Sequence, residues 1–417
     1  MKLKLNAKFY FTTYFFLLLC FYHVKISTYY YWGYFAYLND TFFDFNVLRF
    51  FISSLIFFIN LKFLLQKNKN DLIFGIISFF FILVTIPSLI SFISKNLYPV
   101  ELLFYHQLFF FSMIYFSRSK INFSWIPRVN KVQALYILFG LTTIGIIPYL
   151  IAYGPYINLN NLLFKEIYET RALMGQVSSH YFGYTYSIFT KIMIPLFIVF
   201  ALELKRWYFV IIGVIYMLLF YLFGAHKTIY IGIVLLLVFY KFSYLNIIKF
   251  ILKYSNVLII LSAILAWFSI DDLWILLFRR VHFLPSLLDM QYLEFFNGMP
   301  LYWSDSFLSR FIDYPFDLNH AKSIGRVYYR NDGMNANNGL ISDGYMNLGT
   351  LGVFINIFIV SFYFMVLNSL NIKSKYIGIY LLVIFSLISS SVFTVMLTHG
   401  ALGLLIISIF LLNEKES

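Results

Sequence analysis

Long apolar stretches alternate with short polar turns along most of the chain. A helix that crosses a bilayer needs about 20 mostly apolar residues, and about twelve stretches come close to that length. They lie near residues 9–26, 46–65, 72–94, 101–117, 132–153, 184–203, 207–223, 228–241, 254–270, 345–368, 376–395 and 398–412. This pattern predicts an all-α polytopic membrane protein, in which residues 1–417 form a single integral membrane domain.

The composition supports a membrane protein and excludes several other classes. The chain has 417 residues, of which 61% are hydrophobic, and more apolar surface than a soluble core can bury. The net charge of +13 comes mostly from short turns, so it does not form a patch for nucleic acid. The single cysteine, Cys20, excludes a disulfide framework and a thiolate metal site. The basic stretch 1–8 is interpreted as the start of a retained span, not as a signal peptide.

Basic residues fall mainly in alternate turns, and this asymmetry predicts the orientation of the chain. Cytoplasmic loops of membrane proteins are enriched in Lys and Arg. The enriched turns include Lys62, Lys67, Arg118, Lys120, Lys205, Arg206, Lys249, Lys253, Lys373 and Lys375. Both termini are therefore expected in the cytoplasm, and residues 154–183 and 271–345 are expected to form two long extracytoplasmic loops.

The two long loops are rich in basic residues on the side where such residues are usually avoided. Together they carry Arg171, Arg279, Arg280, Arg310, Lys322, Arg326 and Arg330. A guanidinium offers a planar fork of donors that suits phosphate, so we expect the outer face to bind an anion.

The second loop also predicts a helix of its own. Apolar residues recur at helical spacing after Pro285, at Leu287, Leu288, Tyr292, Phe295 and Phe296. Asp289 and Glu294 fall elsewhere on the turn. This pattern is typical of an amphipathic helix that lies on the membrane surface.

Arg171 and the pair Arg279–Arg280 are candidate phosphate ligands. Arg171 ends the sequence Glu166-Ile-Tyr-Glu-Thr-Arg, and the alternative is a solvated residue paired with Glu166 or Glu169. The two adjacent arginines point to different faces of a helix, so at most one faces a cavity. We favour Arg280 for that role, with interfacial anchoring as the alternative for either residue.

Three more cations are candidates for the same role. Lys191 lies inside a predicted span, where a charge near the bilayer centre costs about 2.5–3.5 kcal/mol unless it faces a polar cavity or reaches the span end. Lys227 lies in a short outer turn, where it is expected either to contact lipid headgroups or to bind a lipid-linked phosphate. Arg326, in the second loop, is the third.

The start of a late span carries Asn335, Asn338 and Asp343. Free N–H groups and the helix dipole at such a start suit an anion, although helix capping alone also explains asparagine there. Asp343 is a candidate general base, as are His282 and His320 in the second loop. His-x-x-His, Glu-x-x-His and Asp-x-Asp motifs are missing from the sequence, so we predict no metal site and no cofactor.

In this arrangement the chain resembles the bacterial Wzy-type polymerases of O-antigen and capsular repeat units. The resemblance rests on a dozen spans, on a loop with Arg171, and on a longer loop that opens Arg279-Arg280-Val-His-Phe-Leu-Pro285. It extends to the Asn- and Gly-rich stretch 335–352 and to the stretch 389–400. It covers about residues 160–412 of the chain.

The resemblance implies a glycosyltransferase of the C-type membrane fold in the bacterial inner membrane. Such enzymes transfer a glycan from undecaprenyl pyrophosphate to the non-reducing end of a new lipid-linked repeat unit. They work without a metal, release undecaprenyl pyrophosphate and lengthen lipopolysaccharide or capsule. Arg171, Arg280 and Lys227 would hold the pyrophosphate, and Tyr292 with Asn335 and Asn338 would contact the glycan. Membrane lipid and a chain-length regulator are further candidate partners.

Two rival functions fit the same features. An O-antigen ligase uses the same donor and fold, but transfers the glycan to lipid A core. A flippase for lipid-linked oligosaccharide is a transporter and not an enzyme. Its charged residues are expected inside the membrane, in two halves related by pseudo-symmetry. The concentration of charge in long outer loops favours an enzyme over a transporter.

Overall fold

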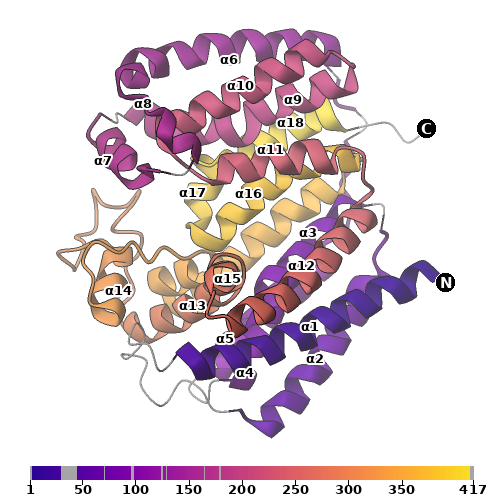
Figure 1. The fold of residues 1–417 in the computed structure, drawn as a ribbon, viewed down its shortest axis with the longest axis vertical. Coiled ribbons are helices and arrows are strands. Elements are labelled where there is room, and N and C mark those ends of the chain that lie inside the picture. The colour runs from indigo at the N-terminus through magenta and orange to yellow at the C-terminus, as the bar shows by residue number, and fades with distance from the viewer. Residues whose placement is uncertain are drawn as a thin grey trace. The chain divides into compact units, whose positions relative to one another are not determined.

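The computed structural model describes residues 2–29, 45–69, 71–94, 98–123, 125–127, 129–163, 165–177 and 180–413, and all regular structure in these ranges is helical (Figure 1). Within them, eight helical segments are long and apolar enough to cross a membrane: Val47–Gln66, Leu72–Ser94, Lys131–Tyr156, Tyr181–Glu203, Trp207–Gly224, Tyr244–Trp267, Leu340–Asn368 and Val392–Leu412. Shorter apolar helices cover Val100–Phe116, Thr228–Phe239 and Ser374–Ser389. The all-α, polytopic class is confirmed, whereas twelve spans remain a prediction.

The expected single domain is composed of two compact units. Unit 1 comprises Met1–Lys120, Leu245–Val366 and Leu387–Val392. Unit 2 comprises Ile121–Tyr244, Leu367–Ser386 and Phe393–Ser417.

Unit 1 is built around a span that is apolar on every side. Its helices are α1 (Lys2–Tyr29), α2 (Val47–Gln66), α3 (Leu72–Phe80), α4 (Ile86–Ser94), α5 (Val100–Phe116), α12 (Tyr244–Trp267), α13 (Leu284–Phe295), α14 (His320–Tyr329) and most of α15 (Leu340–Asn368). A wider π-helical stretch joins α3 to α4, and almost all of the resulting span is buried. A helix that is hydrophobic all round is stable only in such an interior position.

Unit 2 is centred on α9 (Ile194–Glu203), whose residues from Ile194 to Ala201 are all buried. Its other helices include α6 (Lys131–Tyr153), α7 (Ile167–Val177), α8 (His180–Ile188), α10 (Trp207–Gly224), α11 (Thr228–Phe239), most of α16 (Ile377–Ser389) and of α17 (Val392–Leu397), and α18 (Ala401–Ile407). Figure 1 shows α6, α9 and α10 running side by side, in agreement with their mutual packing. At one end of α9, Glu203 accepts hydrogen bonds from Lys131, Lys375 and Tyr376.

The helix α15 is a hairpin of two antiparallel arms. Its backbone leaves the helical conformation at Leu348 and at Gly349, where φ is 59° and ψ is −144°. The side chain of Asn356 donates a hydrogen bond to the carbonyl of Leu340 at 3.0 Å. In a straight helix these two residues would be about 24 Å apart. The short arm, 340–347, therefore folds back along the long arm, 350–368, and the backbones of Gly344 and Gly352 meet directly.

This hairpin changes the expected geometry at the start of the late span. The sequence predicted a helix that begins at the outer surface near Asn338 and runs inward. Because the short arm runs opposite to the long arm, Asn338 lies at the far end of the short arm from the turn at Gly349. The turn, not the asparagine-rich stretch, is the point where the long arm starts.

Two other predicted boundaries were wrong. The span predicted at 254–270 begins at Tyr244, because Lys249 and Lys253 do not interrupt the helix. The sequence placed one break between residues 395 and 398, whereas the structure has two, between Ser389 and Val392 and between Leu397 and Ala401. A tertiary contact to the N–H of Val392, described below, accounts for the earlier of these breaks.

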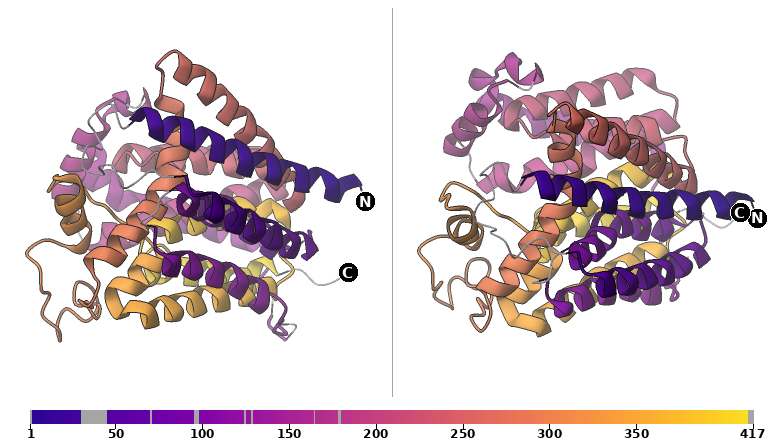
Figure 2. Two further views of the ribbon diagram at one scale, coloured as in Figure 1. Left: turned by 90° about the horizontal axis from the view of Figure 1, so that it is seen from below. Right: turned by 60° about the horizontal axis from the view of Figure 1, so that its bottom comes forward.

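The helix expected on the membrane surface is instead an interior element. All residues of α13 from Ser286 to Leu293 are buried. Its apolar face forms a core with loop residues, which comprises Leu288, Tyr292, Phe296, Leu301, Ile324, Ala336 and Met346. Figure 2 shows that the chain after α13 is mostly irregular around the short α14, so α13 supplies the apolar surface on which this loop folds.

We expect the α15 hairpin to depend on the missing side chain of Gly349. A Gly349→Ala substitution should lower the free energy of unfolding by about 1–3 kcal/mol, since an L-residue is strained at this backbone conformation. Gly140→Ala, inside α6 with no atom within 4 Å of the added methyl group, is the matched control and should be neutral or stabilising. Thermal unfolding in detergent measures both, and equal melting temperatures would contradict the hairpin geometry.

Candidate functional site

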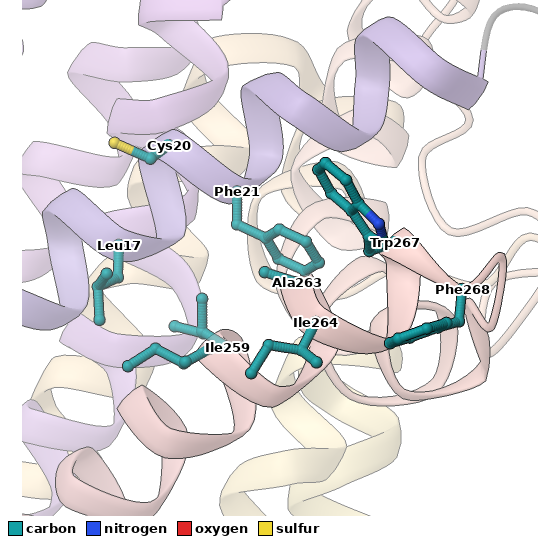
Figure 3. Close-up of a pocket in the computed structure, with 9 residues that line it drawn as sticks. Leu17, Cys20, Phe21, Ile259, Ala263, Ile264, Trp267 and Phe268 are labelled. Atoms are coloured by element: carbon teal, nitrogen blue, oxygen red, sulfur yellow. The ribbon is translucent and has the colours of Figure 1, made fainter.

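The larger pocket of unit 1 has no chemistry for an anion or a sugar. It is a groove of about 560 Å³ between α1 and α12. Its lining residues are Leu17, Cys20, Phe21, Ile259, Ile260, Ala263, Ile264, Trp267 and Phe268 (Figure 3). Such a surface suits hydrocarbon, so the polar candidates lie elsewhere.

Among the described residues of unit 1, the most deeply buried carboxylate belongs to Asp343, in the short arm of α15. It is 1% exposed, and one oxygen accepts hydrogen bonds from the backbone N–H of Val392 and from Asn356, each at 2.9 Å. The other oxygen faces the amide of Asn347 at 3.3 Å. Three donors therefore converge on Asp343, which makes it a structural anchor and leaves little capacity for the base that the sequence suggested.

Asn347 links this anchor to the second long loop. Its side chain donates to the backbone carbonyl of Asp343 at 2.8 Å and accepts from the backbone N–H of Trp303 at 2.7 Å. The loop makes two more backbone bonds here, from Leu301 to Met346 at 2.8 Å and from Tyr302 to Asn347 at 3.1 Å. Tyr302 and Trp303 both have positive φ, at 50° and 57°.

Two residues after this contact, Asp305 pairs with His320. The carboxylate contacts Nδ1 of the imidazole, so Nδ1–H is the donor and Nε2 is left as the proton acceptor. No hydrogen bond from Nε2 is found in the part of the chain that the structure describes, and the His320 side chain is 25% exposed. A carboxylate that holds one nitrogen of a partly exposed histidine is the arrangement of a general base.

A second buried carboxylate, Asp289 of α13, lies at the other end of the short arm. One oxygen accepts hydrogen bonds from Asn338 at 2.9 Å and Ser342 at 2.6 Å. The other lies 3.3 Å from Nε2 of His106, which is itself 2% exposed. A cavity of about 30 Å³ adjoins these groups. Asn338 is thus held inside unit 1, whereas Asn335 is exposed.

Unit 2 contains a group of basic side chains around His226. Arg171 and Lys191 both lie within electrostatic reach of this imidazole. His226 is itself exposed, and partial desolvation, followed by the charges of Arg171 and Lys191, lowers the pKa of its imidazole. The guanidinium of Arg171 donates to the backbone carbonyl of Ala225 at 2.9 Å, which orients it at the end of α10.

Lys191 has an unusual environment for a cation inside a span. It lies in the π-helical stretch Phe189–Met193, and its ammonium donates to the hydroxyl of Ser386 at 2.7 Å. Among the described residues no carboxylate lies within ion-pair distance of it. His399 is also within its electrostatic reach. A partly buried ammonium with only neutral partners is stabilised when an anion binds.

Several predicted residues lie away from these groups. His282 is buried, with Tyr14 2.6 Å from one ring nitrogen and the carbonyl of Leu277 3.1 Å from the other, so neither nitrogen is open. Tyr292 is 1% exposed and donates to the carbonyl of Ala336, so its ring is not a sugar platform.

The remaining predicted cations lie at the surface or beside other groups. Arg326 is held by Asp332 and Asp317 on the exposed face of α14. Lys227 is exposed. Arg279 is half-buried and near Tyr329, while Arg280 is exposed, as expected for adjacent residues on different faces. Among the described residues, no three His, Cys, Asp or Glu side chains gather as a metal site.

Sequence reasoning missed Asp305, Asn347, Asn356, Asp289 and His106. Asp305 stands in a loop without periodicity, so no spacing rule connects it to His320. The two asparagines lie in an apolar span, where a buried amide is itself a usable signal for a polar contact. Comparison of the chain with models of protein families, with curated proteins and with solved structures finds no match.

Burial of His282 should make stability depend on pH. Burial lowers its pKa to about 4, whereas an unfolded histidine titrates near 6.5. As the pH falls from about 6.5 to about 4, the unfolded state binds a proton at this histidine and the folded state does not. The free energy of unfolding therefore falls by about 3 kcal/mol. Chemical denaturation in detergent across this range should show the loss, and His282→Gln should make it smaller by this amount, while the contribution of His226, whose pKa is also lowered, remains. An unchanged slope in the variant would contradict this assignment.

Proposed function

We propose that the protein is a repeat-unit polymerase of the bacterial inner membrane. It joins oligosaccharide units carried on undecaprenyl pyrophosphate into O-antigen or capsular polysaccharide at the outer face. The observation that carries the proposal is the group of basic side chains in unit 2, with Arg171 and Lys191 around His226. A pyrophosphate would supply negative charge to a partly buried ammonium that has no carboxylate partner among the described residues.

The reaction follows from the chemistry of a glycosyl pyrophosphate. A hydroxyl oxygen at the non-reducing end of the acceptor unit attacks the anomeric carbon of the donor glycan. The new carbon–oxygen bond forms as the bond to pyrophosphate breaks, and undecaprenyl pyrophosphate leaves with the electron pair. Arg171 and Lys191 stabilise the charge that develops on this leaving group.

The acceptor hydroxyl must lose its proton, and His320 is the residue that we assign as the base. Of the three candidates, Asp343 is engaged by three donors and His282 is bonded at both nitrogens. Nε2 of His320 takes the proton, while Asp305 fixes the tautomer and stabilises the imidazolium. Arg279, half-buried in the same unit, replaces Arg280 as the favoured second-loop cation.

The rival functions share parts of this chemistry. A ligase would use the same cations and base with lipid A core as the acceptor. A flippase would need the cations but has no use for an Asp–His pair with an open nitrogen. The Asp305–His320 pair therefore favours transfer over transport, and the acceptor decides between polymerase and ligase.

We expect a deletion strain to make only single-repeat glycan and the wild-type gene to restore a ladder on a gel. Arg171→Ala and Lys191→Ala should each lower polymer formation about 100-fold, because each removes charge stabilisation of the leaving group. Lys165→Ala, an exposed cation of the same loop, is the matched control and should keep the ladder.

Other outcomes of this experiment identify the rivals. Long polymer stranded on its lipid carrier in the deletion strain would assign the ligase function. Repeat units that accumulate on the cytoplasmic leaflet would assign the flippase function. Full activity of Arg171→Ala and Lys191→Ala at normal membrane levels would refute the pyrophosphate site.

The base assignment has its own prediction. His320→Gln and Asp305→Asn should lower turnover of purified enzyme, by about 100-fold or more for His320, since general base catalysis contributes that much. Asp313→Asn, an exposed carboxylate in the same loop, should have no effect. The assay uses lipid-linked repeat units extracted from the deletion strain. Wild-type turnover in His320→Gln would eliminate His320 as the base.

A further inference from the structure

The segment between Leu301 and His320 contains Asp305 but has no helix to hold it in place. Its position is fixed at its first residues, where Leu301, Tyr302 and Trp303 donate three backbone hydrogen bonds to the end of the short arm. The third of these has the side chain of Asn347 as its acceptor. Asp305 follows two residues later.

The backbone at this point is strained. Tyr302 and Trp303 are consecutive bulky residues with positive φ, a conformation that persists only when surrounding contacts enforce it. The chain turns here so that Asp305 meets His320 and not solvent. The contacts that hold residues 301–303 in this conformation therefore also determine the position of Asp305.

We infer that Asn347 is a positioning residue for the Asp305–His320 pair. It acts through the N–H of Trp303 and touches neither Asp305 nor His320. The inference rests on the proposed role of His320 as the base.

The chemistry of this position requires an amide. The side chain must accept from Trp303 and donate to the carbonyl of Asp343 at the same time, and an amide does both. A carboxylate would repel the nearby Asp343, and an apolar side chain would leave the Trp303 N–H and the Asp343 carbonyl without partners.

Asn356 provides a matched comparison within the same hairpin. It is as fully buried as Asn347, at 0% exposure, and it also donates to the carboxylate of Asp343. Its other bond goes to the carbonyl of Leu340, so it holds the two arms together and makes no bond to residues 301–303. A purely structural role for these amides predicts equal effects for the two substitutions.

The experiment compares Asn347→Ala with Asn356→Ala in the purified full-length enzyme, with lipid-linked repeat units from the deletion strain as substrate. Asn347→Ala should lower kcat at least tenfold while KM changes less than twofold. Asn356→Ala, at matched folded protein, should retain kcat within threefold. In the Asp305→Asn background, Asn347→Ala should have no further effect, because both act on the same group.

Hydrogen–deuterium exchange supplies a readout that does not require activity. Loss of the bond to Trp303 should speed exchange of the peptide covering residues 301–320 about tenfold in Asn347→Ala, and leave it unchanged in Asn356→Ala. Equal kcat and equal exchange in the two variants, or additive effects with Asp305→Asn, would overturn the inference. If wild-type protein makes no polymer but exchange responds as expected, the polymerase proposal fails while the link from Asn347 to the loop stands.

Discussion

The interior of unit 1 depends on one electrostatic requirement, which is that the charge of Asp343 must be met by donors in an apolar setting. Removing a carboxylate from water costs several kcal/mol unless hydrogen bonds replace its hydration. The donors come from Asn347, Asn356 and the N–H of Val392. Meeting this requirement closes the α15 hairpin and starts a new helix at Val392. It also places Asn347 where its side chain accepts a hydrogen bond from the N–H of Trp303 in the second long loop.

The two units carry different polar chemistry. Unit 1 holds buried carboxylates with amide and imidazole partners, and it also holds the partly exposed imidazole of His320. Unit 2 holds Arg171 and Lys191, with His226 and His399 within electrostatic reach of Lys191. Its Glu203 is already engaged by Lys131, Lys375 and Tyr376 at one end of α9. The basic side chains of unit 2 are thus suited to an anion, and the Asp305–His320 pair of unit 1 is suited to accept a proton.

Hydropathy alone predicted that each apolar stretch forms one straight helix that crosses the membrane once. The bounds of α2, α5, α6 and α10 fall within one or two residues of the expected stretches, because each has its own apolar length between polar turns. The reversal at Gly349 was missed, since two apolar arms in sequence have the same hydropathy as one long helix. Lys191 and Arg171 were proposed as site residues from the cost of a charge inside a span and from a position in a long loop, respectively. Asp305 could not be found, because only the folded loop brings it to His320.

The reversal of chain direction in α15 also affects the order in which its two arms reach their final positions. During synthesis, the long arm with its unbroken apolar sequence satisfies the requirement for a span by itself. The short arm carries a carboxylate whose last donor, Val392, is made 49 residues later. Until that residue emerges, Asp343 has no complete set of partners, and the arm is more stable in water than in the interior. The full set of hydrogen bonds to Asp343 therefore forms only after Val392 has been made.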